Sequence, residues 1–305
     1  AAGGITLWLT KNSRIQMPAL SPPVSGILFF TRNLIPHISN EKIHSSPGRL
    51  LLFAGASSFT LQAQGTMNTN KTASSPLDEA LSLTSEWDKV FPQSDRVEHR
   101  KVTFHNHFGL TLAADLYLPK GATGKLPAIA VCGLFGGVKE QSSGLYAQTL
   151  AERGFITLAF DPSFTGESSG HPRDVFSLDI NTEDFQASVD YLCNLDGVDP
   201  ARVGILGICG WGCIALNAAA NDPRIKAVVA STMYDMPRIG AWGYNDSGTA
   251  DDRYRAKQEI ADLRTSEYAA GLTKHAFTTI PVDQLTGKEP AFVRQYSEYY
   301  KAPRG

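Results

Sequence analysis

Hydrophobic and polar positions in the middle of the chain follow a pattern that predicts strands and helices in turn. Short apolar runs bounded by turn residues predict buried strands at residues 128–132, 155–160, 202–208 and 224–232. Helical spacing of apolar residues predicts helices at residues 142–154, 181–195 and 210–221, the second of them capped by Asn181 or Thr182. This alternation predicts an α/β fold with a mostly parallel, doubly wound sheet covered on both faces.

The pattern changes on either side of this region. Residues 76–91 have the spacing of an amphipathic helix, and two strands, at 97–104 and 110–118, follow around a turn of sequence HNHFG. Beyond Thr232 the chain has helical signals and no further apolar strand run, so we expect a helical lid at about residues 240–300. The predicted domain runs from residue 67 to 305.

Residues 1–66 form a leader that we expect to lie outside the core. Its run at 49–64, RLLLFAGASSFTLQAQ, resembles a signal peptide, with a basic residue, an apolar centre and a small-residue cleavage site. Two explanations stay open. The residues before the run are untranslated and the protein is exported to the periplasm or secreted, or Met67 is the natural start and the protein is cytoplasmic.

Composition narrows the function classes. The chain has 28 Lys and Arg residues and 30 Asp and Glu residues. Because basic residues are not in excess, the sequence does not indicate a nucleic acid as partner. The sequence contains no run of about 18 apolar residues, so it predicts no membrane-spanning helix. The 4 cysteines are too scattered for a disulfide framework. We find neither a phosphate-binding glycine loop nor a metal-ligand constellation, and expect no cofactor and no metal.

The motif with the clearest chemistry is VGILGICGWGC, residues 203–213. An apolar strand ends at Ile208, Cys209 follows at once, and a glycine-rich helix begins. This is the order of a nucleophile elbow, in which a strained turn projects the nucleophile away from the sheet. Gly207 and Gly210 allow the backbone to pass close by, and the helix N-terminus favours a thiolate.

With these residues the sequence resembles the dienelactone-hydrolase-like branch of the α/β hydrolases, in which cysteine often replaces serine. The resemblance covers roughly residues 76–305. It includes the FDPSFTGESSG loop, with Asp161, Gly166 and Ser168, and the CGLFGGVKEQSS loop after the strand at 128–132.

The resemblance implies that Cys209 attacks the carbonyl of a small-molecule ester, lactone or thioester. It also implies an oxyanion hole made of the backbone N–H groups of Gly210 and Leu134. An acyltransferase on the same fold, or a catalytically dead, ligand-binding remnant, are the alternatives. The oligomeric state is not indicated by the sequence.

Two departures from the family pattern stand out. Trp211 occupies the usually small position two residues after the nucleophile, with glycine delayed to Gly212. The family order is nucleophile, acid, histidine, yet the one histidine after Cys209 is His275, in the expected lid. Asp235 is a possible acid, and the triad histidine is unknown. We therefore expect a chain truncated before the last strands and the catalytic histidine.

Overall fold

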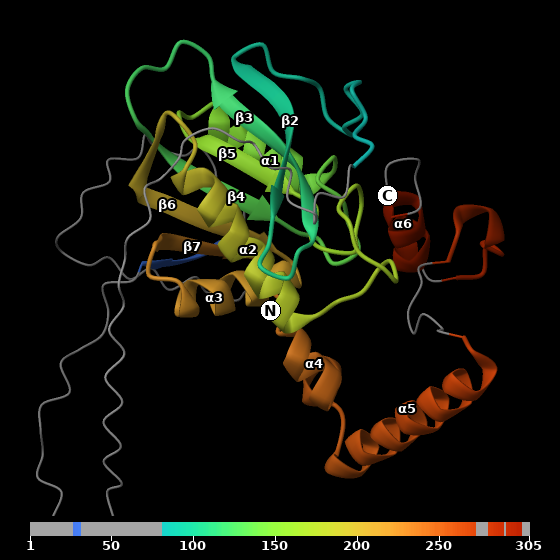
Figure 1. The fold of residues 1–305 in the computed structure, drawn as a ribbon. Coiled ribbons are helices and arrows are strands. Elements are labelled where there is room, and N and C mark those ends of the chain that lie inside the picture. Colours follow the sequence, from blue (N-terminus) through green and yellow to red (C-terminus); the bar gives the residue numbers. More distant parts are fainter. Residues whose placement is uncertain (1–26, 32–80, 273–279, 290, 301–305) are drawn as a thin grey trace, which may run out of the picture.

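The computed structural model describes residues 27–31, 81–272, 280–289 and 291–300 (Figure 1). Its centre is a seven-stranded mixed sheet flanked by helices, as the sequence predicts. The strands are β1 Ile27–Thr31, β2 Val97–His105, β3 Thr111–Pro119, β4 Leu126–Cys132, β5 Ile156–Phe160, β6 Val198–Ile208 and β7 Ile225–Ser231. The helices are α1 Ser142–Ala151, α2 Leu178–Cys193, α3 Trp211–Asn221, α4 Met236–Trp242, α5 Ala250–Ala270 and α6 Ala291–Tyr300, with 3-10 turns η1 Tyr244–Asp246 and η2 Val282–Gln284.

The sheet order is β1-β7-β6-β4-β5-β3-β2. The four inner strands β5, β4, β6 and β7 are parallel, and β3, β2 and β1 join them antiparallel. Cys132 of β4 is paired with Gly207 of β6. Because parallel strands end at the same edge of a sheet, the loops after β4 and β6 are neighbours.

Alternate residues of the inner strands divide the core between two faces. Ala128, Ala130 and Cys132 of β4 belong to a cluster with residues of α2 and α3, whereas Val131 belongs to a second cluster with residues of α1. Burial on both faces explains why these strands read as continuous apolar runs rather than alternating ones. The predicted doubly wound α/β class is confirmed.

The helix predicted over residues 76–91 is wrong for the part that the structure describes, because residues 81–91 form no helix. Asp88 and Lys89 are buried here, and the Lys89 ammonium lies 3.0 Å from the Asp115 carboxylate of β3. Trp87 packs edge-on against Phe91, with ring centroids 5.7 Å apart. Contacts with the sheet thus decide the backbone conformation of this segment and override its helical spacing.

Residues 1–66 are predicted from the sequence to lie outside the core, but five of them form β1. This strand runs antiparallel to β7, with Ile27 opposite Ser231 and Thr31 opposite Ala227. An edge strand has a row of unpaired backbone N–H and C=O groups that any extended segment can pair with. The signal-like run at 49–64 and Met67 lie outside the described residues.

The helical region beyond β7 contains α4, α5 and α6, as expected from its sequence. In Figure 1, α5 projects away from the sheet, and none of its 21 residues is buried. The start of α2 differs from the prediction, because Ser177 accepts a hydrogen bond from the Ile180 N–H and caps the helix earlier than Asn181. Within the described part of the chain, no helix has the length and apolar character needed to cross a membrane.

Candidate active site

Cys209 lies at the junction between β6 and α3 in a left-handed backbone conformation, with φ of 58°. Its N–H donates to the Ser231 carbonyl at the end of β7 (2.9 Å). Its own carbonyl accepts from the N–H groups of Gly212 (3.0 Å) and Tyr234 (3.2 Å). A non-glycine residue with positive φ is costly and persists where its surroundings hold it. The geometry is therefore that of the predicted elbow, with a half-buried thiol at its tip.

Close approach of backbone explains the glycines on both sides of the elbow. A Cβ at Gly207 would lie 2.2 Å from the Trp211 carbonyl oxygen, and one at Gly212 would lie 2.8 Å from the Met233 side chain. Trp211 itself is buried, with its ring 6.3 Å from that of Phe185 in α2. The bulky residue thus packs into the core instead of the site, and Gly212 lets α3 lie close to β7.

The two predicted oxyanion donors lie on neighbouring loops. Gly210 is the N-cap of α3, which has no side-chain cap, and a Cβ there would lie 3.4 Å from the Phe135 Cβ. Leu134 directly precedes Phe135 in the chain and packs against the same apolar cluster as Cys209. Among the described residues, neither the Gly210 N–H nor the Leu134 N–H has an acceptor. Both are available to a ligand, although their role in an oxyanion hole stays a prediction.

The loop between β4 and α1 is fixed by Lys139, a residue that the sequence analysis missed. The fully buried Lys139 ammonium contacts the carboxylates of Asp161 (2.8 Å), Glu167 (2.6 Å) and Glu140 (2.6 Å). Burial by itself would lower the pKa of Lys139, but Asp161 and Glu140 outweigh it and raise the pKa well above its usual range. The loop is therefore tied to the end of β5 by a lysine that stays charged.

Asp161 is a structural anchor within this network. Its carboxylate accepts hydrogen bonds from the backbone N–H groups of Lys139 (2.7 Å) and Glu167 (2.9 Å). Its carbonyl accepts from the Ser168 hydroxyl at 2.7 Å. The resemblance of the FDPSFTGESSG loop to the superfamily loop thus has a physical basis, because Asp161 joins that loop to the one that carries Leu134.

Three carboxylates of the same network, from Asp88, Glu140 and Glu167, gather closely enough to hold a metal ion. The Lys101 ammonium lies 3.7, 3.2 and 2.8 Å from them, respectively. Burial tends to lower the pKa of Lys101, but its hydrogen bond to Glu167 and the nearby acids outweigh this and raise it. The position between the three carboxylates is therefore held by a cationic side chain.

This network predicts a specific response to acid. Burial by itself would raise the pKa of Glu167, but hydrogen bonds from Lys101 and Lys139 outweigh it and lower the pKa to about 2. A carboxyl whose pKa is lowered by folding stabilises the fold above its unfolded pKa, and that stability is lost as pH falls toward the folded value. The stability advantage of the parent over Glu167→Gln should therefore be largest at neutral pH. It should shrink as the pH falls from about 4.5 toward about 2.

Urea unfolding of the two proteins at pH 7, 4.5 and 3 measures this difference. The matched control is Glu98→Gln, because the Glu98 side chain is 57% exposed and should show little change at any of these pH values. A Glu167→Gln difference that stays constant across this range would show that Glu167 is not held ionised by its lysines.

Helix α6 brings a second unpredicted residue, Tyr300, to the loop after β4. The Gln141 amide donates to the Tyr299 carbonyl (2.8 Å), and the Ser142 N–H donates to the Tyr299 hydroxyl (3.2 Å). The Tyr300 ring lies 4.0 Å from a Cβ position at Gly136. Burial, and after it the proximity of Cys209, raises the pKa of Tyr300. The Tyr300 phenol is therefore neutral and lies over the loop after β4, on the helix that contacts the start of α1.

The structure gives Cys209 no histidine partner among the described residues. His99 pairs with Asp115, His107 pairs with Glu183, and His275 lies outside the described residues. Asp235 is exposed and caps α4 by accepting the Arg238 N–H (3.0 Å). Asp235 directly follows Tyr234, whose N–H donates to the Cys209 carbonyl, so Asp235 lies at the same edge of the sheet as Cys209. Its role as the acid stays a prediction, as does truncation before the histidine.

The other cysteines have the surroundings of packing residues. Burial raises the pKa of the Cys132 thiol, and of Cys213 and Cys193 as well. Cys213 donates its thiol hydrogen to the Gly210 carbonyl at 3.0 Å. Their thiolates are disfavoured, so Cys209 is distinguished from them by its place at the strand–helix turn.

A nucleophile elbow on a mixed sheet with helices on both faces defines an α/β hydrolase. A family model described as "Dienelactone hydrolase family" matches residues 112–234, which include the elbow, the Asp161 loop and the loop after β4.

Two bacterial proteins are similar to this chain over a longer stretch than the family model matches. The Pseudomonas aeruginosa protein PA2218 is 58% identical over 226 residues, which are 74% of this chain and 60% of PA2218. Its crystal structure has a TM-score of 0.68 at 57% identity, over 74% of this chain and 70% of that chain. Escherichia coli YcjY is 35% identical over 210 residues, 68% of each protein.

A fungal relative, the acyltransferase drtE of Aspergillus calidoustus, is 30% identical over 198 residues, 65% of this chain and 59% of drtE. The chain thus spans about 60% of the length of PA2218 and of drtE. It is an α/β hydrolase and belongs to the dienelactone hydrolase family.

Proposed function

We propose that the protein is a hydrolase of carboxylic esters, lactones or thioesters that works through an acyl-cysteine at Cys209. The observation that supports this most is the Cys209 backbone, held at positive φ between β6 and the N-terminus of α3. A thiol in that position projects from the sheet, and within the described part of the chain the N–H groups of Gly210 and Leu134 have no acceptor.

The first step of the proposed reaction transfers the acyl group. The Cys209 thiolate attacks the carbonyl carbon, and the oxyanion of the tetrahedral intermediate accepts hydrogen bonds from Gly210 and Leu134. The intermediate collapses when the bond to the leaving group breaks, so that an alkoxide, phenolate or thiolate departs and takes up a proton. The acyl group is then joined to Cys209 as a thioester. Water attacks that thioester in the second step and restores the thiol.

The neutral Tyr300 phenol offers a hydrogen-bond donor next to the loop after β4. A hydroxyl whose pKa is raised is a hydrogen-bond donor and not a base at neutral pH. We infer that it hydrogen-bonds a substrate oxygen or the departing group and that α6 limits the entry of water.

The test compares three acetyl donors that differ only in their leaving group: p-nitrophenyl acetate, S-acetyl-N-acetylcysteamine and p-nitroacetanilide. We expect the chain to release at least one equivalent of p-nitrophenolate and of thiol, and to leave the anilide intact over the same time. An amine anion is expelled from the tetrahedral intermediate far less readily than a phenolate or a thiolate unless a general acid protonates it, so the anilide should stay intact. Release no faster than with heat-denatured chain would contradict the proposal.

Acyl transfer to an alcohol is the second candidate, because the relative drtE is named an acyltransferase. The same assay with added glycerol separates the two. Free acetate as the main product supports the hydrolase, and acetylated glycerol supports the acyltransferase.

A further inference from the structure

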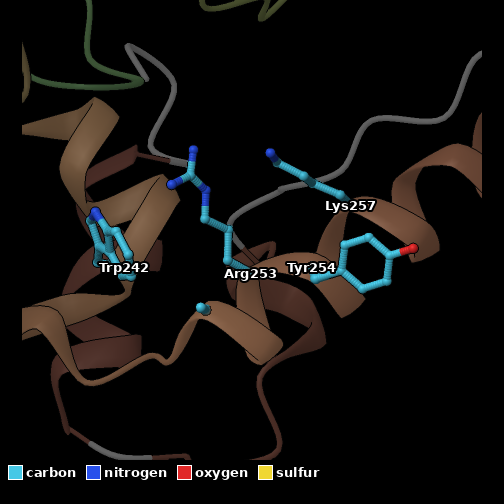
Figure 2. Close-up of a pocket in the computed structure, with 5 residues that line it drawn as sticks. Trp242, Arg253, Tyr254 and Lys257 are labelled. Carbon is cyan, nitrogen blue, oxygen red and sulfur yellow. The ribbon is translucent and has the colours of Figure 1, made fainter.

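A pocket between α4 and α5 lies outside the site described so far. It has a volume of about 300 Å³ and is lined by Trp242, Ala250, Arg253, Tyr254 and Lys257 (Figure 2). Arg253 and Lys257 are one helical turn apart on α5, and Figure 2 shows both pointing to the same side of the helix. The pocket therefore joins two cationic side chains with two aromatic ones.

The two cations of the pocket have no acidic partner among the described residues. By contrast, Arg238 pairs with Asp246 (2.7 Å), and Arg255 pairs with Asp252. The carboxylates of Asp246 and Asp252 are thus already engaged by other arginines. At 100° per residue, Asp251 lies on a different side of α5 from Lys257. The pocket consequently keeps a local positive charge.

One further feature favours an anion in this pocket. The Arg253 guanidinium lies 5.4 Å from the centroid of the Trp242 ring, which holds its planar group in one orientation. A fixed guanidinium loses less side-chain entropy when it binds an anion.

Helix α4 connects this pocket to the nucleophile. Its first residue, Met236, places its Cγ 3.1 Å from a Cβ position at Gly210, and its last residue, Trp242, lines the pocket. A helix of 7 residues is about 10 Å long at about 1.5 Å per residue. One substrate molecule can therefore reach from the Cys209 thiol to the pocket.

We propose that this pocket binds a phosphate group on the thiol portion of a thioester substrate while its carbonyl is attacked at Cys209. The inference rests on the proposed function and narrows its substrate class. A phosphate carries about −1.5 to −2 charges and three acceptor oxygens, which match an arginine and a lysine acting together. The aromatic rings of Trp242 and Tyr254 provide apolar walls for the chain that follows the phosphate.

The test uses two substrates that differ only in the phosphate, S-acetyl-pantetheine and S-acetyl-4′-phosphopantetheine. The rate of Cys209 acetylation is followed by intact mass at substrate concentrations below saturation and at low salt. We expect the parent to react about tenfold faster with the phosphorylated thioester. The double variant Arg253→Gln/Lys257→Gln should lose this preference and keep the parent's rate with S-acetyl-pantetheine.

The matched control is Arg255→Gln/Lys120→Gln, which removes the same charge from residues outside the pocket and should keep the preference. Equal rates with both thioesters in the parent, or a preference that survives in the pocket variant, would overturn the inference while leaving the acyl-cysteine intact.

If neither thioester acetylates Cys209, the proposed function fails, and the pocket is tested by calorimetric titration with 4′-phosphopantetheine itself. Saturable binding that the pocket variant loses would support the site. Absence of binding, or equally tight binding of inorganic phosphate alone, would overturn it as a thioester site.

Discussion

Replacing Cys209 with alanine is expected to lower the rate of p-nitrophenolate release from p-nitrophenyl acetate at least about 1,000-fold. The substitution removes the atom that forms the covalent bond, whereas the backbone N–H groups of Gly210 and Leu134 remain. Stabilisation of the oxyanion without a nucleophile leaves only slow attack by water. The measurement is the initial rate of absorbance change under identical conditions for parent and variant.

Cys213→Ala is the matched control, because it makes the same chemical change one helical turn further along α3. Its thiol is engaged with the Gly210 carbonyl and its pKa is raised by burial, so the rate should change by no more than about threefold. Loss of activity in both variants would indicate that the elbow collapses without its thiols. Retention of activity in Cys209→Ala would remove Cys209 from the reaction.

Replacing Lys139 with methionine is expected to lower the free energy of unfolding by about 3–5 kcal/mol. The ammonium is fully buried and contacts three carboxylates, from Glu140, Asp161 and Glu167. Methionine fills a similar volume but leaves these acids without their shared cation, and uncompensated buried charge is costly. The same change should slow Cys209 acylation, because the loop that carries Leu134 loses its tie to β5.

Urea unfolding followed by circular dichroism measures the loss of stability at pH 7. Lys120→Met is the control, because Lys120 is exposed and its ammonium donates to the Asp95 carbonyl, so its effect should stay within about 0.5 kcal/mol. A loss below about 1 kcal/mol for Lys139→Met would mean that the network relaxes, through water or protonation, more easily than its geometry implies.

The sequence predicted the inner sheet because burial on both faces leaves a clear trace. β4 and β5 are short apolar runs with turn residues on either side, and no polar partner is needed to place them. The segment at 81–91 was predicted wrongly because its conformation depends on distant contacts. Asp88 and Lys89 are charged residues that look solvated in sequence, yet they are buried against Asp115 of β3.

The residues of the candidate site likewise include some that a local sequence pattern predicts and others whose positions depend on distant contacts. Cys209 is predicted as a nucleophile from the sequence because a cysteine between an apolar strand and a glycine-rich helix is a local pattern. Lys139 and Tyr300 could not be predicted in this way, because their positions depend on partners that are far away in sequence, Asp161 and Glu167 for the first and the loop after β4 for the second. Trp211 departs from the family pattern, which has a small residue two positions after the nucleophile. Its burial beside Phe185 explains why the elbow accommodates this bulky side chain.

The central claim is that the acyl group of a substrate is transferred to the Cys209 sulfur. The most direct measurement is peptide mass mapping of the chain after brief reaction with p-nitrophenyl acetate and acid quenching, followed by treatment of a second sample with hydroxylamine. We expect a single acetyl group on the peptide that contains Cys209, removed by hydroxylamine as a thioester should be. Acetyl groups spread over lysines and resistant to hydroxylamine, with Cys209 unmodified, would contradict it.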